Sequence, residues 1–496
     1  MSIKGLFLAA TTLGSFQTFA DSVWTPVIQH DLTHIYTTVK DNHPEYVDTQ
    51  NDYFRQWLEQ GYQQGLKNAE AAESLNDAMT LISTYVAGFA DGHFFLHLNY
   101  QPKTIKWAGI QIRRFGYDYR VDYTDSSFSA SMPAHRARLV SCDGQLAEDI
   151  MNNEVLKARF NAPDLNSAKV RYAPMLLADD GLGQRTYFSH CRFEHNEKNR
   201  DYTLEWKTVL VSDYTQKTTS PFTPPDYSFT IVARDKYWIT LPGFSPDNNE
   251  KDTLRSIFKK IAAVRTTASH FVVDVRGNGG GNSQWGVEAA KALYGDAFIE
   301  KYQQAHSDES YALWRVSNDN IQYLHNALPG IEEQFGKASE AYTAFTALVA
   351  NMKRTLEQGD KLIRQGGETS SVQSASIKSS AEASSTLPAA ATQAKILFVT
   401  DSRCGSACLD FVDLMLGLPN VVHVGHETSA DTVYTDVRPG QLPSGLGRYS
   451  LAQKVYRDRP RKHNESYVPT HFYPGDIGNA DRLKQWLFEE GVEPLQ

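Results

Sequence analysis

Apolar residues recur along this chain at two spacings. From residue 23 to about 100 they recur every three or four positions, as in DYFRQWLEQGYQQGL and SLNDAMTLISTYVAGF, which is the period of an amphipathic helix. Between about 107 and 233 they alternate with polar residues in short runs such as IQIRRFGYDYRVDYTD, bounded by Gly, Pro, Asn and Asp. The first segment therefore predicts a helical domain and the second a β-rich module.

Buried strands and helices alternate from residue 235 onward. KYWITLPGF precedes a predicted helix over 252–266, and HFVVDVRGNGGGN precedes a helix that begins near Gln284. The same plan returns in AKILFVTD, a buried strand, followed by SACLDFVDLMLGL, a helix. Two strand–turn–helix units predict an α/β core.

An insertion separates these two units. Residues 299–364 have a helical pattern, and the Ser/Ala-rich stretch that follows has few large apolar side chains, so we expect disorder over 366–393. The predicted organisation is a signal peptide at 1–20, a helical domain at 21–100, a β-rich module at 101–233, a first core part at 234–298, an insertion at 299–395 and a second core part at 396–496.

Composition and charge indicate the compartment of the protein and the class of its partners. MSIKGLFLAATTLGSFQTFA places Lys4 before an apolar run and ends in small residues, which predicts a secretory signal cleaved after Ala20. No later segment has ~18 consecutive apolar residues, so we expect a soluble protein that is exported to the periplasm or secreted. The formal charge of −9 is spread along 496 residues without a basic stripe, which argues against a nucleic-acid partner.

The four cysteines of an exported chain predict disulfides, with three possible pairings. The simplest joins Cys142 to Cys191 and Cys404 to Cys408. The second bridge is the less favoured, because regular helix geometry strains a bond between residues four apart unless the turn is irregular. No second CxxC or HxxxH motif supports zinc, and the CxxxC spacing disfavours a thiol oxidoreductase, which would need CxxC.

Two turns after buried strands could do chemistry. Ser406, in DSRCGSACLDF, opens a predicted helix, where its hydroxyl is exposed and the N–H groups from Ala407 onward could face an oxyanion. Serine is also among the best helix N-caps, and spacing alone favours the cap. The glycines of DVRGNGGGN bring main-chain N–H groups close to a ligand. This loop suits an oxyanion, since no GxGxxG register or Lys-Ser/Thr pair supports a nucleotide.

The motifs together resemble a known family. HFVVDVRGNGGG and KILFVTDSRCGSACLDF are similar to the paired signatures of the tricorn-type and C-terminal-processing serine peptidases, which also include the interphotoreceptor retinoid-binding repeats. DGHFFLHL, ARLVSCDGQ, YWITLPGF and HVGHETSADTVY resemble further segments of the family. The resemblance implies a ClpP/crotonase-like α/β core with an N-terminal helical domain and a PDZ-like module. It also implies a serine peptidase that acts on peptides or proteins without a cofactor or a metal.

The same resemblance implies roles for particular residues. Ser406 is the expected nucleophile, with oxyanion donors from the Ala407 N–H and from Gly280 or Gly281. Water would then hydrolyse the acyl-enzyme. The PDZ-like module would capture an extended peptide by strand addition, although the Gly-Leu-Gly-Phe sequence that binds a terminal carboxylate is not visible.

The expected base is a histidine. Processing-type members use a Lys about two dozen residues after the serine, but no Lys lies between Ser406 and Lys454. His93, in DGH, matches the tricorn-type arrangement, in which a histidine takes the proton. His423 and His426, close to the predicted nucleophile helix, are the alternatives.

A third group should orient the base. Glu465 in RPRKHNESYVPTHFY follows Ser406 by 59 residues and precedes Val468, where the family's glycine is missing. Glu490 in EEGVEP is the rival, and we choose Glu465. The alternative function is a non-catalytic protein that binds peptides or lipophilic ligands on the same scaffold. Retention of Ser406, His93 and the glycine loop favours the enzyme.

Overall fold

The computed structural model describes residues 22–218, 225–306, 310–366 and 387–490. The predicted signal peptide and most of the predicted disordered stretch lie outside these residues. The end of that stretch is described and packed: Ala391 N donates to Tyr294 O at 2.9 Å, and Thr392 is buried. The prediction of disorder is therefore wrong for this end.

The N-terminal part is helical, as its periodicity predicts. Its helices are α1 (Trp24–Asn42), α2 (Glu45–Asp48), α3 (Asp52–Ala69) and α4 (Leu75–Ala87). Helix α4 begins with a capping box, in which Ser74 accepts from Asp77 N and Asp77 accepts from Ser74 N. Helix α1 buries one face, formed by Ile28, Leu32, Ile35 and Val39.

The second part is β-rich, as predicted. Its strands are β2 (Thr104–Trp107), β3 (Ile110–Phe115), β4 (Asp118–Thr124), β5 (Arg138–Cys142), β6 (Gln145–Leu146), β7 (Ala178–Asp179), β8 (His190–His195), β9 (Lys198–Thr203) and β10 (Lys207–Leu210). They form one sheet of order β3-β4-β5-β8-β9, with β6 paired to β5, and a smaller sheet of order β10-β2-β7. The accompanying helices are α5 (Ala147–Ile150), α6 (Asn166–Tyr172) and α7 (Val211–Thr218), with short irregular turns at Met151–Val155, Leu156–Ala158 and Ala173–Leu177.

The α/β core is a six-stranded sheet. Its strands, in spatial order, are β11 (Ser228–Ala233), β12 (Lys236–Thr240), β13 (His270–Asp274), β16 (Lys395–Thr400), β17 (Val421–Gly425) and β22 (His471–Phe472). All neighbours from β12 to β22 are parallel. The central strands are buried on both faces, which explains the continuous apolar runs HFVVD and KILFVT.

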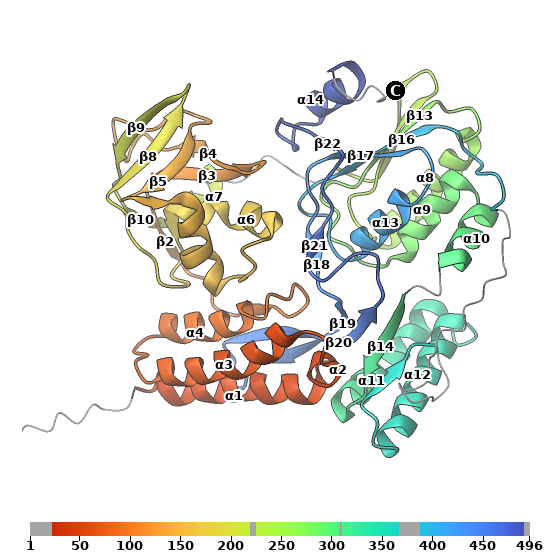
Figure 1. Cartoon of the computed structure of the whole chain (residues 1–496), viewed down its shortest axis with the longest axis horizontal. Coiled ribbons are helices and arrows are strands. Elements are labelled where there is room, and N and C mark those ends of the chain that lie inside the picture. Colours follow the sequence, from red (N-terminus) through yellow and green to blue (C-terminus); the bar gives the residue numbers. More distant parts are fainter. Residues whose placement is uncertain (1–21, 219–224, 307–309, 367–386, 491–496) are drawn as a thin grey trace, which may run out of the picture.

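Helices cover both faces of this sheet (Figure 1). One face packs against α8 (Asn248–Val264), α9 (Gln284–Tyr294), α10 (Asp296–His306) and α13 (Ala407–Leu416). The other packs against α14 (Ala480–Gln485) and the turn Trp486–Glu490 that continues it. Because β13 and β16 are parallel neighbours, the loops that follow them meet at one edge of the sheet, where α/β folds bind their ligands.

A second, antiparallel sheet draws on three distant parts of the chain. Its members are β1 (Leu96–Leu98), β14 (Tyr311–Arg315), β15 (Leu362–Arg364), β19 (Tyr434–Gln441) and β20 (Gly447–Arg457). The predicted insertion also contains α11 (Asn318–Phe335) and α12 (Glu340–Glu357). The all-helical prediction for 299–364 is therefore wrong for β14 and β15. Strand β14 pairs with β20, far along the chain, and β15 pairs with β14.

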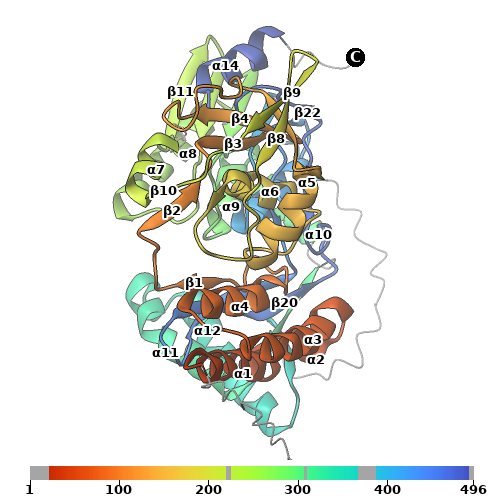
Figure 2. The same ribbon diagram turned by 90° about the vertical axis from the view of Figure 1, so that its left-hand side faces the viewer.

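The N-terminal helices share their core with this second sheet. The cluster that contains Ile28 and Phe54 also contains Tyr434, Leu451 and Val455. Figures 1 and 2 both show α1, α3 and α4 lying against β20. The helical segment predicted for 21–100 therefore packs on strands that follow Ser406 in sequence, and this brings the α4–β1 loop toward the core.

Candidate active site

Ser406 lies in the turn between β16 and α13. Its backbone has φ 53° and ψ −126°, and its side chain makes no hydrogen bond that caps α13. A positive φ is strained for a residue with a Cβ, and such strain concentrates at functional sites. The interpretation of Ser406 as a helix cap is therefore wrong, and its partly exposed hydroxyl is left for another purpose.

The glycine loop after β13 lies directly against this turn. Gly280 has φ 101°, and a Cβ placed on it would lie 2.7 Å from Ser406 Cβ and 2.9 Å from Ala407 N. Gly405 N also donates to Asn278 O at 3.3 Å. Only glycine fits at position 280, so the structure brings together the predicted nucleophile turn and the predicted oxyanion loop.

The N–H groups of the two loops differ in their availability. Gly280 N donates to Asn278 Oδ1 at 3.0 Å. Within the described ranges, the N–H groups of Gly281 and Ala407 donate to no acceptor. Gly281 is therefore the better of the two glycine candidates, together with Ala407 at the N-terminus of α13.

Asp401, the first residue after β16, joins the two loops. Its Oδ1 accepts from Gly277 N at 3.0 Å and from Arg403 N at 3.1 Å. Burial raises the pKa of Asp401, and these two N–H groups oppose that rise. Asp401 was not predicted as a site residue, although an Asp directly after the buried strand in AKILFVTD is a signal for one.

A disulfide brackets Ser406. Cys404 and Cys408 are bonded, with their Cα atoms 5.3 Å apart, and both are fully buried. Helix α13 begins only at Ala407, so Cys404 lies in the irregular turn that such a bridge requires. A second disulfide joins Cys142 on β5 to Cys191 on β8.

The two disulfides allow a matched test. Closed-loop entropy assigns about 4 kcal/mol to the bridge with a sequence separation of 49 and about 2 kcal/mol to the bridge with a separation of 4. We expect Cys142→Ala/Cys191→Ala to lower the free energy of unfolding in urea more than Cys404→Ala/Cys408→Ala does. Only the second pair should slow the reaction of Ser406 with a fluorophosphonate, because only that bridge shapes its turn. Equal labelling rates for both double variants would contradict this role.

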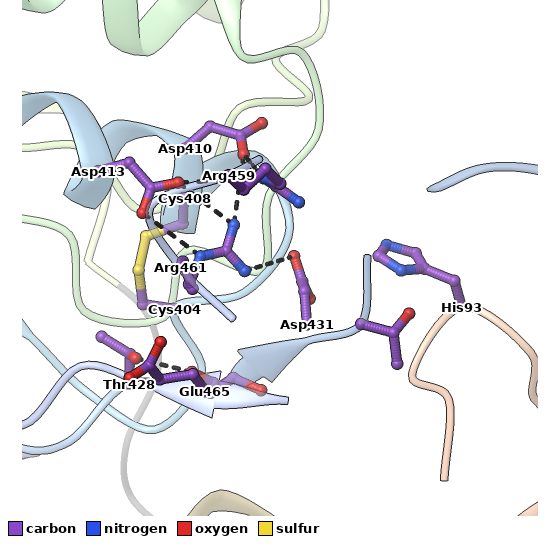
Figure 3. A network of polar contacts seen from close by, with 12 residues as sticks. His93, Cys404, Cys408, Asp410, Asp413, Thr428, Asp431, Arg459, Arg461 and Glu465 are labelled. Atoms are coloured by element: carbon purple, nitrogen blue, oxygen red, sulfur yellow. Dashed lines mark hydrogen bonds and ion pairs between the residues drawn. A yellow bond between two sulfur atoms is a disulfide. The ribbon is translucent and has the colours of Figure 1, made fainter. Parts of the chain in front are cut away.

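His93 lies in the loop between α4 and β1. Asp91 Oδ1 accepts from His93 N at 2.9 Å, and Ser450 Oγ donates to His93 O at 2.7 Å. The backbone is thus held on both sides, whereas the imidazole makes no hydrogen bond to any residue the structure describes. In Figure 3, the ring lies beyond Asp431 from the Cys404–Cys408 bridge.

The alternative histidines have structural partners. His423 Nε2 lies 2.8 Å from Thr400 Oγ1, and His426 Nε2 lies 2.9 Å from Tyr473 O. Burial lowers the pKa of His423 to about 4 and also lowers the pKa of His426. Because His423 is buried, His426 is half-buried and both rings are already hydrogen-bonded, neither replaces His93 as the candidate base.

Glu465 lies apart from His93. It begins β21 (Glu465–Ser466), which pairs with β18 (Ala430–Asp431) so that Glu465 faces Asp431. Its carboxylate is exposed and accepts from Lys462 N at 2.8 Å. No hydrogen bond links it to His93 in the described part of the chain, and Figure 3 shows the two side chains well separated. The side chain of the rival, Glu490, lies outside the described residues.

A buried charge network connects α13 to β18 (Figure 3). Arg461 is almost fully buried and lies 3.5 Å from Asp410, 3.4 Å from Asp413 and 3.7 Å from Asp431. Arg459 adds a second cation beside Asp410. Buried charges need such partners, so this network fixes α13 relative to the segment that contains Asp431.

A cleft of about 510 Å³ opens beside the glycine loop. Its lining residues are Pro225, Asp226, Tyr227, Pro242, Gly243, Ser245, Glu250, Gly279, Gly280 and Gly281. The described helices include none that is long and apolar enough to cross a membrane. Across the same ranges, no group of three or more His, Cys, Asp or Glu side chains is placed to hold a metal ion.

Known proteins share this fold and this core. Residues 237–471 match the family model described as peptidase family S41. Mature CPAF complexed with lactacystin has 12% sequence identity and a TM-score of 0.60, and the match covers 94% of this chain and 98% of that chain. A CPAF serine-to-alanine mutant has the same identity and TM-score, with 96% and 100% covered. The photosystem II D1 C-terminal processing protease has a TM-score of 0.35 at 12% identity, with 90% and 93% covered. No curated protein sequence matches.

The matched core and the shared fold define a class of hydrolase. Residues 237–471 match peptidase family S41, which supports a serine-type peptidase, as the sequence motifs predict. The matched region extends from β12 to β22 and contains Ser406, Glu465 and the glycine loop. His93 and the β-rich module lie before it.

Proposed function

We propose that this chain is an exported endopeptidase or oligopeptidase in which Ser406 is the nucleophile. The observation that carries the proposal is the Ser406 turn: φ is positive, the hydroxyl caps nothing, and Gly280 lies against it. A strained strand-to-helix turn that exposes a serine hydroxyl beside free N–H groups is the arrangement of a nucleophile with its oxyanion hole.

The proposed reaction begins with attack of Ser406 Oγ on a peptide carbonyl, while His93 accepts the hydroxyl proton. The carbonyl oxygen becomes an oxyanion near the N–H groups of Ala407 and Gly281. His93 then donates its proton to the leaving amine, so the C–N bond breaks and an acyl-enzyme remains. Water hydrolyses the ester with His93 again as base, and Ser406 recovers its proton.

Glu465 is proposed as the acid that orients the protonated imidazole. This role rests on its distance after Ser406 in sequence and on its position opposite Asp431. Catalytic hydrogen bonds are often long without substrate and tighten in the Michaelis complex. The proposal therefore requires His93 to approach both Ser406 and Glu465 when a peptide binds.

Two further features support an exported peptidase with a peptide-binding module. The leader-like first twenty residues and the two disulfides agree with an oxidising compartment. The antiparallel sheet has β3 and β9 at its edges, and a peptide could bind at such an edge as an added strand. The substrate we propose is accordingly a peptide or an extended segment of a protein.

The test is labelling of the purified mature protein with a fluorophosphonate, with the labelled residue identified by mass spectrometry. We expect the label on Ser406 and a labelling rate at least about 100-fold lower in His93→Ala, since general-base catalysis contributes on that order. His97→Ala is the matched control, because His97 is exposed on the adjacent strand β1.

Each outcome decides a separate point. Normal labelling of His93→Ala would remove His93 from the base position. A folded wild-type protein that neither reacts with the probe nor hydrolyses labelled casein would support the alternative, a non-catalytic binder on the same scaffold.

A further inference from the structure

Asp91 is a fully buried carboxylate two residues before His93. Its Oδ1 accepts from His93 N at 2.9 Å and from Thr432 Oγ1 at 2.7 Å. The remaining oxygen, Oδ2, lies 3.7 Å from His43 Nε2 and makes no hydrogen bond in the described structure. A buried ion is costly unless it is paired, so a carboxylate in this place calls for an explanation.

The protein keeps Asp91 ionised despite its burial. Burial raises the pKa of Asp91, but the His43 ring, the charge of His93 and the Thr432 hydroxyl outweigh this and hold the pKa below its usual value. His43 Nδ1 lies 3.2 Å from Glu45 N, which donates to it, so His43 carries its proton on Nε2, the nitrogen that faces Asp91. A negative charge is thus maintained behind the loop that presents His93.

Thr432 connects Asp91 to the nucleophile helix. It follows Asp431, which contacts Arg461, and Arg461 contacts Asp410 and Asp413 on α13. Figure 3 shows the contacts of Arg461 with Asp410, Asp413 and Asp431, between the Cys404–Cys408 bridge and His93. The hydroxyl of Thr432 is therefore the group through which the peptidase core contacts the carboxylate of Asp91, in the loop that contains His93.

Two further contacts hold the same loop from the core side. Asn464 Nδ2 donates to Ala90 O at 2.8 Å, and Ser450 Oγ donates to His93 O at 2.7 Å. These bonds involve main-chain groups of the loop. Asp91 is the loop side chain that bonds both to the core and to His93.

We propose that Asp91, through its hydrogen bonds to Thr432 and His93, is the positioning residue that places the base against the Ser406 turn. The inference rests on the proposed roles of Ser406 and His93 and adds a residue to them. It implies that an interaction between the N-terminal helical part and the core fixes the position of His93 relative to Ser406. A displacement of about 1 Å in a reacting group costs on the order of 100-fold in rate, so loss of this interaction should be visible in kcat.

The test compares isosteric variants in the full-length mature protein. Thr432→Val removes the hydroxyl and keeps the shape, Thr432→Ser restores the hydroxyl, and Asp91→Asn removes the charge. Asp125→Asn is the matched control, because Asp125 is also buried, also accepts from the N–H two residues on at 3.0 Å, and also has a lowered pKa, but lies in the β-rich module. Hydrolysis of fluorescein-labelled casein and the rate of fluorophosphonate labelling are measured alongside urea unfolding.

We expect Thr432→Val and Asp91→Asn to lower kcat and the labelling rate about 10- to 100-fold with KM within about twofold of wild type. Thr432→Ser should recover most of the rate, and Asp125→Asn should keep it. If Thr432→Val and Asp91→Asn are folded and react at wild-type rates while His93→Ala reacts slowly, the role of Asp91 is overturned and the role of His93 stands. If wild type is not labelled at Ser406, the proposed function and this inference both fail. If Thr432→Val and Asp91→Asn unfold, a wild-type rate in Thr432→Ala at a temperature where it is folded would likewise overturn the inference.

Discussion

Replacement of Ser406 by alanine is expected to reduce hydrolysis of labelled casein by on the order of 10⁶-fold and to abolish fluorophosphonate labelling. The methyl group of alanine cannot attack a carbonyl, and the remaining oxyanion donors support only a small residual rate. The free energy of unfolding should change by less than about 1 kcal/mol, because the hydroxyl caps nothing and the side chain is partly exposed.

Ser402→Ala is the matched control for this prediction. Ser402 is a partly buried serine in the same connection between β16 and α13, but it lies before the disulfide-bridged turn. Its replacement should leave both the labelling and the hydrolysis intact. Undiminished labelling of Ser406→Ala, or loss of labelling in Ser402→Ala alone, would move the nucleophile to another residue.

Replacement of Gly280 by alanine is expected to lower kcat by about 100-fold or more while the protein stays folded. The new Cβ would lie 2.7 Å from Ser406 Cβ, 2.8 Å from Gly405 O and 2.9 Å from Ala407 N. Two of these atoms belong to the backbone, so the nucleophile turn would have to shift. The φ of 101° adds strain to any residue with a Cβ.

The neighbouring glycine provides the control. A Cβ on Gly279 would meet no atom within 4 Å, and its φ lies outside the region that favours glycine. Gly279→Ala should therefore retain activity within a few-fold of wild type. Similar kcat values for Gly279→Ala and Gly280→Ala, measured on labelled casein, would show that close packing of the loop on Ser406 is not required.

The sequence allowed good predictions wherever the signal was local. HFVVD and KILFVT are continuous apolar runs, and such runs predict buried parallel strands irrespective of the rest of the chain. The short strands of the second sheet could not be predicted, because LIR in β15 has no periodicity to read. That strand exists because β14 pairs with it, and β14 in turn pairs with β20.

In the candidate site, too, some features could be predicted from the sequence and others could not. The nucleophile turn and the glycine loop could be predicted because each is encoded by adjacent residues after a buried strand. The availability of their N–H groups could not, since it depends on a bond from Gly280 N to the Asn278 side chain. The role proposed for Asp91 could not be predicted, because it depends on a hydrogen bond from Thr432, which lies in another part of the chain.

Local patterns in the chain thus specify the N-terminal helices, the strands and helices of the α/β core, and the two turns that contain Ser406 and the glycine loop. These depend on backbone preferences and on burial within a few residues. The position of His93 relative to the Ser406 turn is not specified by local patterns. It depends on the packing of α1–α4 against β20 and on contacts of Asp91 and Ser450, which join segments hundreds of residues apart. Such contacts form only when the whole chain is folded, so the tertiary structure alone determines how close His93 comes to Ser406.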